Sequence, residues 1–467
     1  MINGVLTAAE AGGLEVFLVG GVLRNLAIGA RPGRDYDFVL EGGGVKALSE
    51  KAARVFGGTS FLLDKETSSY RVVSKARGRR PALVLDFSSI KGGSIIDDLR
   101  ARDFTVDAIG MDLREISCAV PRVMDPAGGL VDAAERRLRA ASPGVFDADP
   151  LRVMRALRVS QGYGLGINRE TLALMEAKSA LLASVSAERV RDELILIFTA
   201  PGTPASMEFA YRCGVIEAVL PAAAGWEEVD GYRLKAHAIK TLEEAEAIVE
   251  GVRSGAYLAR HARLRAYLGS GAGPLSNAAL FKLVAFFHDA GKPCTLSRES
   301  GRLRFIGHEG KGAAIVKELL AGLRFARRVC SDAARIVGNH HRAFMLAALR
   351  EPTPRARAHF FRAAGGQTGL MLLLLALADA RATRGGEDPE MLALVDRMLS
   401  FYYNTYTRKR PRPLLNGREI METFGVEQGP CVGMIMGWVS KGVEQGVVTN
   451  RKEAVEYVRE RLASREG

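Results

Sequence analysis

Two aspartates stand at alternate positions where an apolar run begins, in the segment DYDFVL. Asp35 and Asp37 would point to the same side of a β-strand, because successive side chains in a strand alternate between its faces. Two converging carboxylates repel each other unless a cation lies between them, and Mg²⁺ held by carboxylates and substrate phosphates meets that need. The pair predicts a two-metal site that activates an attacking hydroxyl and neutralises a leaving pyrophosphate; a solvated pair on a strand edge is the alternative.

A glycine pair precedes these aspartates in the segment FLVGGVLRNLAIG. The apolar residues before Gly20 and Gly21 predict a short strand, and the residues after them predict a helix. Glycine lets the backbone approach a triphosphate closely, and the free N–H groups of a helix N-terminus attract negative charge. A strand, glycine turn and helix in this order therefore favour phosphate binding beside the two aspartates.

A third segment, DADPLRVMRALR, combines hydrogen-bond acceptors with a row of guanidinium groups. Asp149 and Arg152 are three residues apart, so on a helix they would share a face and could meet the edge of one nucleotide base. Arg155 and Arg158 continue the row at the same spacing, which predicts a basic ridge for phosphate or base contacts. A solvated basic helix face is the alternative.

Most of the seven histidines fall in one later region of the chain. Imidazoles and carboxylates together are a natural ligand set for a borderline divalent metal, and an adjacent His-Asp pair can bind one ion or bridge two. The cluster therefore predicts a metal centre, with a metal-free helical domain as the alternative. Its members are His237, His288, Asp289, His308, His340, His341 and Asp379.

Three ordered motifs in the first third of the chain resemble a known family. GGVLRN followed by RDYDFVL is similar to the start of the nucleotidyltransferase superfamily, and RARDFTVDAIGMDL with DADPLRVMRALR resembles class II tRNA nucleotidyltransferases and bacterial poly(A) polymerases. The resemblance implies that Asp35 and Asp37 carry Mg²⁺, and that Asp149 and Arg152 present hydrogen-bond edges to the incoming base. It further implies that Gly20, Gly21 and Arg24 hold the triphosphate and that Arg102 and Asp103 contact the ribose.

The chain departs from the usual family pattern at three positions. Asn25 replaces the usual aspartate after Arg24, Asp107 replaces the usual asparagine, and Ala148 replaces a frequent glutamate. None of these changes removes a metal-binding carboxylate, so we still expect the chain to be catalytically active. Base selectivity is the property that they leave open.

The segment LVAFFHDAGKP resembles the signature of HD-superfamily phosphohydrolases. By that resemblance His237, His288, Asp289 and Asp379 hold a divalent transition metal or Mg²⁺. A metal ion there would lower the pKa of a bound water, and that water would then hydrolyse a phosphomonoester or open a 2′,3′-cyclic phosphate. The segments FIGHEGKGA and IVGNHHR are similar to the HD domain that is fused to this same nucleotidyltransferase family.

Hydropathy along the chain predicts the elements that position these residues. Residues 14–113 alternate five short β-like runs with turn clusters: EVFLVG, DYDFVL, SYRVVSK, ALVLDF and AIGMDL. From about residue 132 onward apolar residues recur at helical spacing. We expect an α+β protein: a mixed α/β nucleotidyltransferase head (1–140), followed by a predominantly α-helical neck (141–225), HD domain (226–385) and C-terminal domain (386–467).

Composition indicates which kind of binding partner and which cellular compartment to expect. Lysines and arginines outnumber acidic residues by 65 to 53, and the net charge of +12 favours a polyanion such as RNA. Basic clusters at 77–80, 135–139 and 407–413 are candidate RNA contacts. Five scattered cysteines predict a reduced cytoplasmic protein, and the longest apolar run, 370–377, is too short to span a membrane.

The sequence therefore predicts a tRNA nucleotidyltransferase that adds C, A or both to an RNA 3′ end from CTP and ATP, with the tRNA acceptor end as the expected partner and a second, HD phosphohydrolase activity. Two alternatives remain open at this point. One is a poly(A) polymerase, and the other is an HD phosphohydrolase whose degenerate head only binds RNA.

Overall fold

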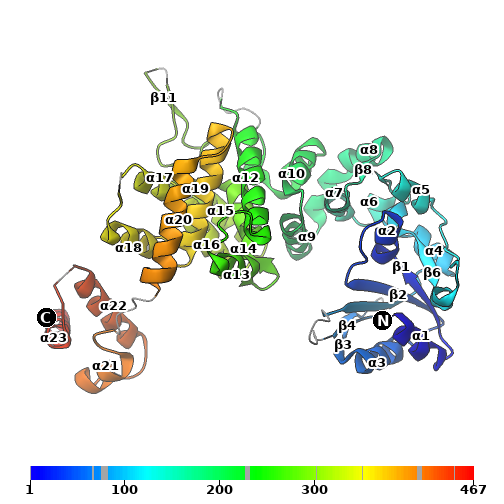
Figure 1. Cartoon of the computed structure of the whole chain (residues 1–467), viewed down its shortest axis with the longest axis horizontal. Helices are drawn as coiled ribbons and strands as arrows, with labels where there is room; N and C mark the ends of the chain where they lie inside the picture. Colours follow the sequence, from blue (N-terminus) through cyan, green and yellow to red (C-terminus); the bar gives the residue numbers. More distant parts are fainter. Residues whose placement is uncertain are drawn as a thin grey trace.

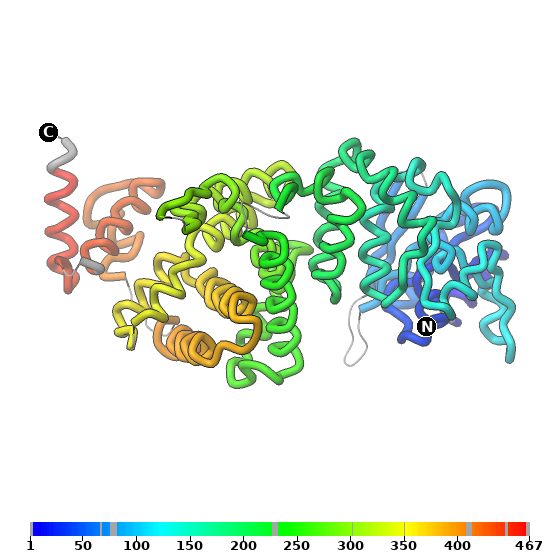
Figure 2. The backbone as a smooth tube through the Cα atoms, turned by 90° about the horizontal axis from the view of Figure 1, so that it is seen from above, coloured from blue at the N-terminus to red at the C-terminus, as the bar shows by residue number. Residues whose placement is uncertain are grey.

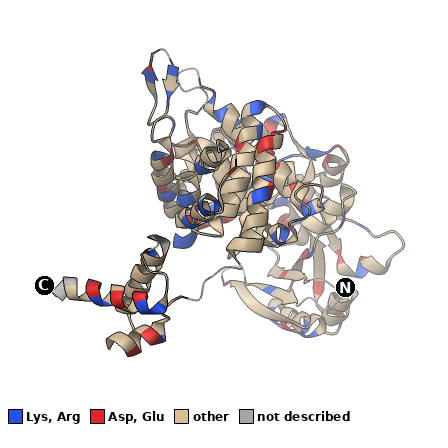
Figure 3. Cartoon of the chain, turned by 60° about the vertical axis from the view of Figure 1, so that its left-hand side comes forward, with Lys and Arg blue, Asp and Glu red and all other residues tan. Residues whose placement is uncertain are grey.

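The computed structural model of the chain describes residues 2–65, 68–74, 82–226, 232–300, 302–349, 351–407, 413–445 and 447–466. The protein is elongated, with the N-terminal sheet at one end, a helical body in the middle and the last helices at the other end (Figures 1 and 2). Lys and Arg occur in all three of these parts (Figure 3).

One mixed sheet forms the centre of the head, in the strand order β3-β4-β5-β2-β1-β6. β2 and β5 are parallel, and the other neighbours in the sheet are antiparallel. The five predicted strands are confirmed; β3 was not predicted, because it is an edge strand whose side chains are mostly exposed. The strands are β1 (Glu15–Val19), β2 (Asp35–Glu41), β3 (Gly58–Asp64), β4 (Ser69–Ser74), β5 (Val84–Ser89) and β6 (Gly110–Asp112).

Hydrophobic side chains bury both faces of this sheet. Leu18 and Phe38 pack into a core with one group of helices, whereas Val19 and Val39, with opposite parity, pack against the helix at 95–100. Asp37 has the parity of Val39, so it belongs to the face that the helix at 95–100 covers. The head helices are α1 (Ile2–Glu10), α2 (Gly21–Ala27), α3 (Val45–Phe56), α4 (Ile95–Arg100) and α5 (Gly129–Ala134).

The middle of the chain is helical, as predicted, apart from three short two-stranded pairs. The neck consists of α6 (Val145–Ala148), α7 (Arg152–Tyr163), α8 (Arg169–Lys178), α9 (Ala187–Thr199), α10 (Thr203–Arg212) and α11 (Val215–Val219). The HD region consists of α12 (Leu234–Ser254), α13 (Ala262–Gly269), α14 (Asn277–Phe287), α15 (His308–Gly322), α16 (Arg327–Val337), α17 (Arg342–Ala347), α18 (Pro354–Ala363), α19 (Thr368–Arg384) and α20 (Pro389–Phe401).

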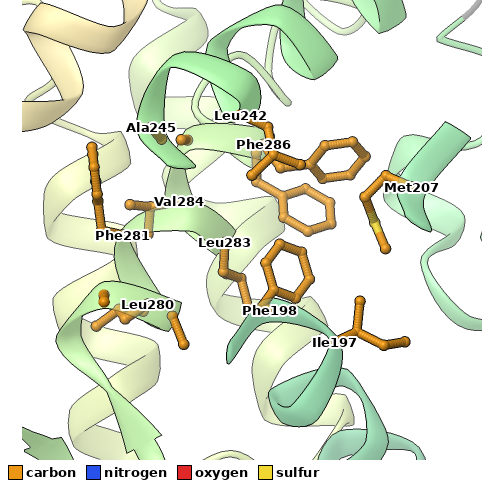
Figure 4. Packing of buried hydrophobic residues seen from close by; sticks show 14 of the residues in the cluster. Ile197, Phe198, Met207, Leu242, Ala245, Leu280, Phe281, Leu283, Val284 and Phe286 are labelled. Carbon is orange, nitrogen blue, oxygen red and sulfur yellow. The ribbon is translucent and has the colours of Figure 1, made fainter. Parts of the chain in front are cut away.

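Neck and HD helices share one continuous hydrophobic core. Phe198 of α9 and Met207 of α10 lie beside Leu242 of α12 and Phe286 of α14 (Figure 4). Trp226, at the predicted boundary, is only 1% exposed, and its ring centroid lies 5.6 Å from that of Phe286. Trp226, next to the predicted division near residue 225, therefore belongs to this shared core, and the division itself stays a prediction.

The C-terminal segment has a small core of its own. Its helices are α21 (Gly417–Phe424), α22 (Pro430–Gln445) and α23 (Arg451–Glu466). Among the described residues no single helix is both long and apolar enough to cross a bilayer; α18 and α19 meet that test only as a pair, bent by 101°. The apolar run at 370–377 lies buried inside α19.

Candidate active site and metal centre

Gly20 brings the backbone against the carboxylate of Asp37. The last residue of β1, Val19, pairs with Asp37 of β2, so the turn that follows β1 passes directly beside that aspartate. Gly20 has a φ of +73°, in the left-handed region that favours glycine. A Cβ atom there would lie 3.2 Å from Asp37 Oδ2 and 2.9 Å from Arg102 Nη1. The predicted glycine turn and the predicted catalytic carboxylate therefore meet at the start of α2.

A third carboxylate lies beside the two aspartates of β2, Asp35 and Asp37. Asp86 of β5 is the register partner of Asp37 on the neighbouring parallel strand. Arg71 of β4 donates two hydrogen bonds to Asp86, at 2.8 and 2.7 Å. Its hydrogen bond to Asp86 raises the pKa of Arg71 against the effect of burial, and the charges of Asp35 and Asp37 add to the rise. One guanidinium group thus stands among three carboxylates.

These carboxylates fit a divalent cation. Burial raises the pKa of Asp37; Arg102 opposes that rise, and the charge of Asp86 adds to it. A partly desolvated carboxylate beside another carboxylate is stabilised by a bound cation, and carboxylate oxygens are the ligands that Mg²⁺ prefers. Asp35, on the same face of β2, is exposed, so the site opens to solvent.

Arg24 does not face the open site. Its side chain is buried, Nη1 donates a 2.6 Å hydrogen bond to Asp107 Oδ1, and Nη2 donates another to Asn25 at 3.2 Å. The guanidinium lies over the ring of Tyr163 from the neck helix α7, 3.8 Å from its centroid. Arg24 therefore has Asp107, Asn25 and Tyr163 as partners in this structure, and its contact with the triphosphate stays a prediction.

A cavity of about 300 Å³ lies between the head and the neck. Five of the predicted nucleotide-binding residues line it together, although they come from segments far apart in the sequence. Gly20, Gly21, Asp35 and Asp37 do not line it, but Arg102 does, and Arg102 also contacts the glycine turn beside Asp37. The five lining residues are Arg102, Asp103, Asp149, Arg152 and Arg155.

Two expectations about the segment 147–158 need correction. Asp149 is extended and precedes α7, which begins at Arg152, so the two residues do not share a helix face. They nevertheless line the same cavity, because the turn folds Asp149 beside the first turn of α7. The basic ridge is neutralised: Arg155 lies 2.6 Å from Asp103, and Arg158 lies 2.6 Å from Glu193.

The structure adds residues that the sequence motifs did not indicate. Arg189 of α9 lines the cavity and pairs with Asp149 at 2.7 Å, and Glu193 lines it one helical turn further on. The four-residue spacing of Arg189 and Glu193 in ERVRDELILIFT was the available signal, since such residues share a helix face. Their approach to Asp149 depends on how α9 packs, which no local pattern shows.

The arginines of the basic cluster at 135–139 have partners within the chain, although Arg136 and Arg137 are exposed. Arg137 and Arg139 both pair with Asp132, and Arg136 donates to the carbonyl of Ile28. Internal partners therefore occupy these guanidinium groups. The clusters at 77–80 and, in most of its length, 407–413 lie outside the described residues.

The four predicted HD ligands converge from three helices. His237 lies on α12, His288 and Asp289 directly follow α14, and Asp379 lies on α19. His237 Nε2 lies 3.2 Å from Asp379 Oδ1 and 3.5 Å from Asp289 Oδ2. His288 Nε2 lies 3.3 Å from Asp289 Oδ2 and 3.9 Å from Asp379 Oδ1. The tertiary structure thus assembles the predicted set around one point.

The chemistry of this set fits a divalent cation. His288 Nδ1 lies 2.8 Å from the carbonyl oxygen of Ala285, which can only accept, so Nδ1 carries a proton and Nε2 presents a lone pair once the ring is neutral. That Nε2 is buried and has no hydrogen-bond partner among the described residues. Burial opposes charge on His288, but Asp289 and Asp379 outweigh it and raise the pKa of His288 to about 9. A site that attracts a proton this strongly also suits a metal.

Three family models match successive parts of the chain. The poly A polymerase head domain matches residues 16–139, and the HD domain matches residues 237–384. Between them, residues 164–226 match the probable RNA and SrmB-binding site of polymerase A. The matches follow the order of head, neck and HD domain.

Relatives of known activity span nearly the whole chain. The CC-adding tRNA nucleotidyltransferase of Geobacter sulfurreducens is 32% identical over 465 residues, which cover 97% of this chain and 94% of that protein. The chain belongs to the tRNA nucleotidyltransferase family. This nucleotidyltransferase is also 29% identical to the A-adding tRNA nucleotidyltransferase of Deinococcus radiodurans, over 94% of each chain. The poly(A) polymerase alternative is not favoured by these relatives.

Solved structures share the fold of this tRNA nucleotidyltransferase. A CCA-adding enzyme in complex with CTP has a TM-score of 0.60 at 18% identity, covering all of this chain and 95% of the other. The Thermotoga maritima CCA-adding enzyme complexed with tRNA has a TM-score of 0.57 at 18% identity, covering 99% and 94% of the two chains. At this level of identity the likeness concerns the fold.

Proposed function

We propose that this chain adds C, A or both to the 3′ end of tRNA, with CTP and ATP as nucleotide donors. One observation carries the proposal: Arg102 lies beside Asp37 at the glycine turn and also lines the cavity between head and neck. Carboxylates for catalysis and polar groups for nucleotide choice are therefore adjacent. The CC-adding and A-adding relatives support C and A as the nucleotides and tRNA as the acceptor.

Asp35 and Asp37 would hold Mg²⁺. When bound there, the metal ions would lower the pKa of the attacking 3′-hydroxyl and neutralise the leaving pyrophosphate. Gly20 leaves room for the triphosphate because it has no Cβ atom, and Gly21 begins α2, where backbone N–H groups are free. Arg102 offers positive charge beside Gly20, next to Asp37.

Nucleotide choice is assigned to the cavity residues. Asp103 pairs with Arg155 in this cavity, and both side chains can also hydrogen-bond to the ribose hydroxyls. Asp149 supplies acceptors, whereas Arg152 and Arg189 supply donors, so together they can meet the hydrogen-bonding edge of a pyrimidine or an adenine. Arg158, bound to Glu193, would act by holding α7 against α9.

Extension of labelled tRNA transcripts tests this proposal. Acceptors that lack CCA, lack CA or lack only the final A are incubated with full-length protein and Mg²⁺, with CTP, ATP or both. Addition that stops at CC, at a single A or at CCA would support it and identify the variant of the activity. Long A tails, or no extension of any tRNA, would overturn it.

A second activity is proposed for the HD centre. The observation that carries it is the convergence of His237, His288, Asp289 and Asp379 around one point beside a cavity of about 1010 Å³. A divalent transition metal or Mg²⁺ held there would supply an activated water for opening a phosphomonoester or a 2′,3′-cyclic phosphate on an RNA end. Lys292 lines that cavity and orients Asp289: its Nζ lies 2.6 Å from Asp289 Oδ2 and donates to the Tyr232 hydroxyl at 2.8 Å.

Phosphate release from a 3′-phosphorylated and a 2′,3′-cyclic-phosphorylated RNA tests the second activity. We expect hydrolysis that depends on added Mn²⁺, Co²⁺ or Ni²⁺ and is lost in the variant Asp379→Asn. Hydrolysis that persists in this variant, or its absence with every metal, would overturn the assignment.

We also place the enzyme in the cytoplasm, since all five cysteines are unpaired.

A further inference from the structure

A groove of about 1290 Å³, here called the α17–α18 groove, borders the cavity of the HD centre. Met345 and Leu349 line both the groove and that cavity, so these two side chains form the boundary between them. α17 and α18 lie next to each other on the side of the helical body that faces the C-terminal helices (Figure 1). Neither proposed activity assigns a role to this groove.

Arginine side chains give the α17–α18 groove a positive charge. Arg355, His359 and Arg362 follow one another at spacings of four and three residues on α18, so they share a helix face, and Arg342 begins α17. Within the described residues, no carboxylate lines the groove. Arg355 and Arg362 are exposed and form no ion pair with another described residue, and Arg342 Nε donates to the neutral amide of Asn339 at 2.6 Å. The groove therefore presents three guanidinium groups whose charge no lining carboxylate balances.

Apolar and aromatic side chains lie between these charges. Met345 is 71% exposed and Leu349 is 50% exposed, which is unusual for side chains of this kind. Tyr406 also lines the groove, and its ring packs against those of Phe361 and Tyr402, with centroids 5.3 and 5.7 Å apart. A ring that two neighbours hold in place is a rigid surface on which a planar group can stack.

This combination of groups fits a single strand of RNA. Guanidinium groups bind backbone phosphates, and aromatic and apolar side chains contact unpaired bases. A double helix stacks its bases inside, so it could not cover Met345, Leu349 and Tyr406 with them. An acidic peptide would satisfy the arginines alone, whereas every nucleotide of an RNA strand carries both a phosphate and a planar base.

We propose that the α17–α18 groove binds the last nucleotides of a single-stranded RNA 3′ end, whose terminal phosphate lies in the cavity of the HD centre. The strand passes from the groove into that cavity over Met345 and Leu349, which line both. The substrate of the HD centre is then an RNA strand and not a free nucleotide. This inference deepens the proposed hydrolase activity and rests on it.

Hydrolysis of a short and a long substrate by the full-length protein tests the inference. The short substrate is 2′,3′-cyclic AMP, and the long one is an RNA hexamer that ends in a 2′,3′-cyclic phosphate; both are supplied with Mn²⁺, Co²⁺ or Ni²⁺. In each, the oxygen of one water bonds to phosphorus, one bond from phosphorus to a ribose oxygen breaks, and that oxygen takes the proton. The double variant Arg355→Ala with Arg362→Ala should raise KM for the hexamer about tenfold through two lost phosphate contacts, with kcat and the hydrolysis of cyclic AMP unchanged.

A matched arginine variant controls for a general loss of positive charge. Arg328 is an exposed arginine of α16 that pairs with Asp332 and does not line the groove, so Arg328→Ala should leave both substrates unaffected. The double variant changes only exposed side chains and should keep the Tm of the wild type. An unchanged KM for the hexamer, or an equal rise for both substrates, would overturn the groove assignment while the hydrolase activity stands.

Photo-cross-linking tests the groove without catalysis. The same hexamer, with thiouridine in place of uridine, is bound to the full-length protein in EDTA, and the cross-linked peptides are identified by mass spectrometry. We expect cross-links to α17 and α18 that the double variant loses. If the wild type hydrolyses neither substrate, the hydrolase proposal fails, and cross-links to α17 and α18 would still support RNA binding in the groove. Cross-links confined to the head and neck, or displacement of the hexamer from α17 and α18 by poly-glutamate but not by unlabelled RNA, would overturn it.

Discussion

Arg24 Nη1 lies 2.6 Å from Asp107 Oδ1 in the buried junction between the glycine turn and the neck helix α7. Asn25, next to Arg24, accepts from the same guanidinium at 3.2 and 3.3 Å. The family pattern has an aspartate at position 25 and an asparagine at position 107, and this chain has the reverse at both. The two departures therefore form an exchange in which one carboxylate and one amide still surround Arg24.

This exchange predicts a rescue. Asp107→Ala removes a hydrogen bond to a buried charge, so the free energy of unfolding of the head should fall by about 2 kcal/mol. Asn25→Asp in that background returns a carboxylate to Arg24 and should recover at least half of the loss. Urea unfolding of the four proteins in this cycle measures the coupling. If Asp107→Ala costs the same with and without the Asn25→Asp change, the two positions are independent.

Gly20→Ala should abolish most nucleotidyl transfer. Alanine at a φ of +73° costs about 1 kcal/mol, and its Cβ atom would also press on Asp37 and Arg102. Gly29→Ala is the matched control: its φ is +72°, but a Cβ atom there meets nothing within 4 Å. Both variants should lose stability in thermal unfolding, Gly20→Ala the more, but only Gly20→Ala should lose kcat. An equal loss of activity in both would assign the effect to backbone strain alone.

Asp37→Asn should lower kcat at least about a thousandfold, because the metal ions lose a charged ligand at the reacting centre. Glu41→Gln, at the other end of the same strand, should keep wild-type activity. Extension of a tRNA lacking CCA, measured under single-turnover conditions, compares the two. Since the HD centre is separate from this strand, the metal-dependent phosphate release proposed for that centre should be the same in both variants; a change there would indicate wider unfolding.

Arg189→Ala should change the choice between CTP and ATP. Arg189 holds the carboxylate of Asp149 at 2.7 Å, so its loss frees that group to turn or to accept differently from a base. A change of about tenfold in the ratio of kcat/KM for the two nucleotides corresponds to one hydrogen bond, about 1.4 kcal/mol. Arg191→Ala, whose side chain pairs with Asp192 and with the carbonyl of Arg324 outside the cavity, should leave the ratio unchanged. Equal ratios in all three proteins would remove Arg189 from nucleotide selection.

His261 predicts a loss of stability on acidification. Burial lowers the pKa of His261, with Arg260 adding to the effect, while its Nε2 lies 2.9 Å from Asp396 of α20. A histidine whose folded pKa lies below its unfolded value of about 6.5 contributes stability above pH 6.5 that is lost as the pH falls through the folded pKa. The melting temperature of wild type should therefore fall more steeply below pH 6.5 than that of His261→Asn. Parallel curves for the two proteins would contradict this assignment.

Local patterns were sufficient where the physics is local. Alternation places Asp35 and Asp37 on one strand face, and a glycine turn before a helix predicts Gly20, because both depend on residues next to each other in the chain. The HD ligands His288 and Asp289 are likewise adjacent. Reading the residues in order was therefore enough to predict five of the six strands of the sheet and the family, whereas the roles of Asp35 and Asp37 stay predictions.

Tertiary packing determines which side chains are buried and which residues they contact. The sequence does not show which residues contact Arg24. In the folded chain Arg24 is buried between Asp107 and Tyr163, which are distant along the chain. Arg189 joins Asp149 because α9 packs beside the start of α7, and Asp289 faces histidines of α12 and α15 because α12, α14, α15 and α19 converge on it. Side-chain charge and ligand type are properties of a residue, whereas burial and the choice of partner arise only when distant segments pack together.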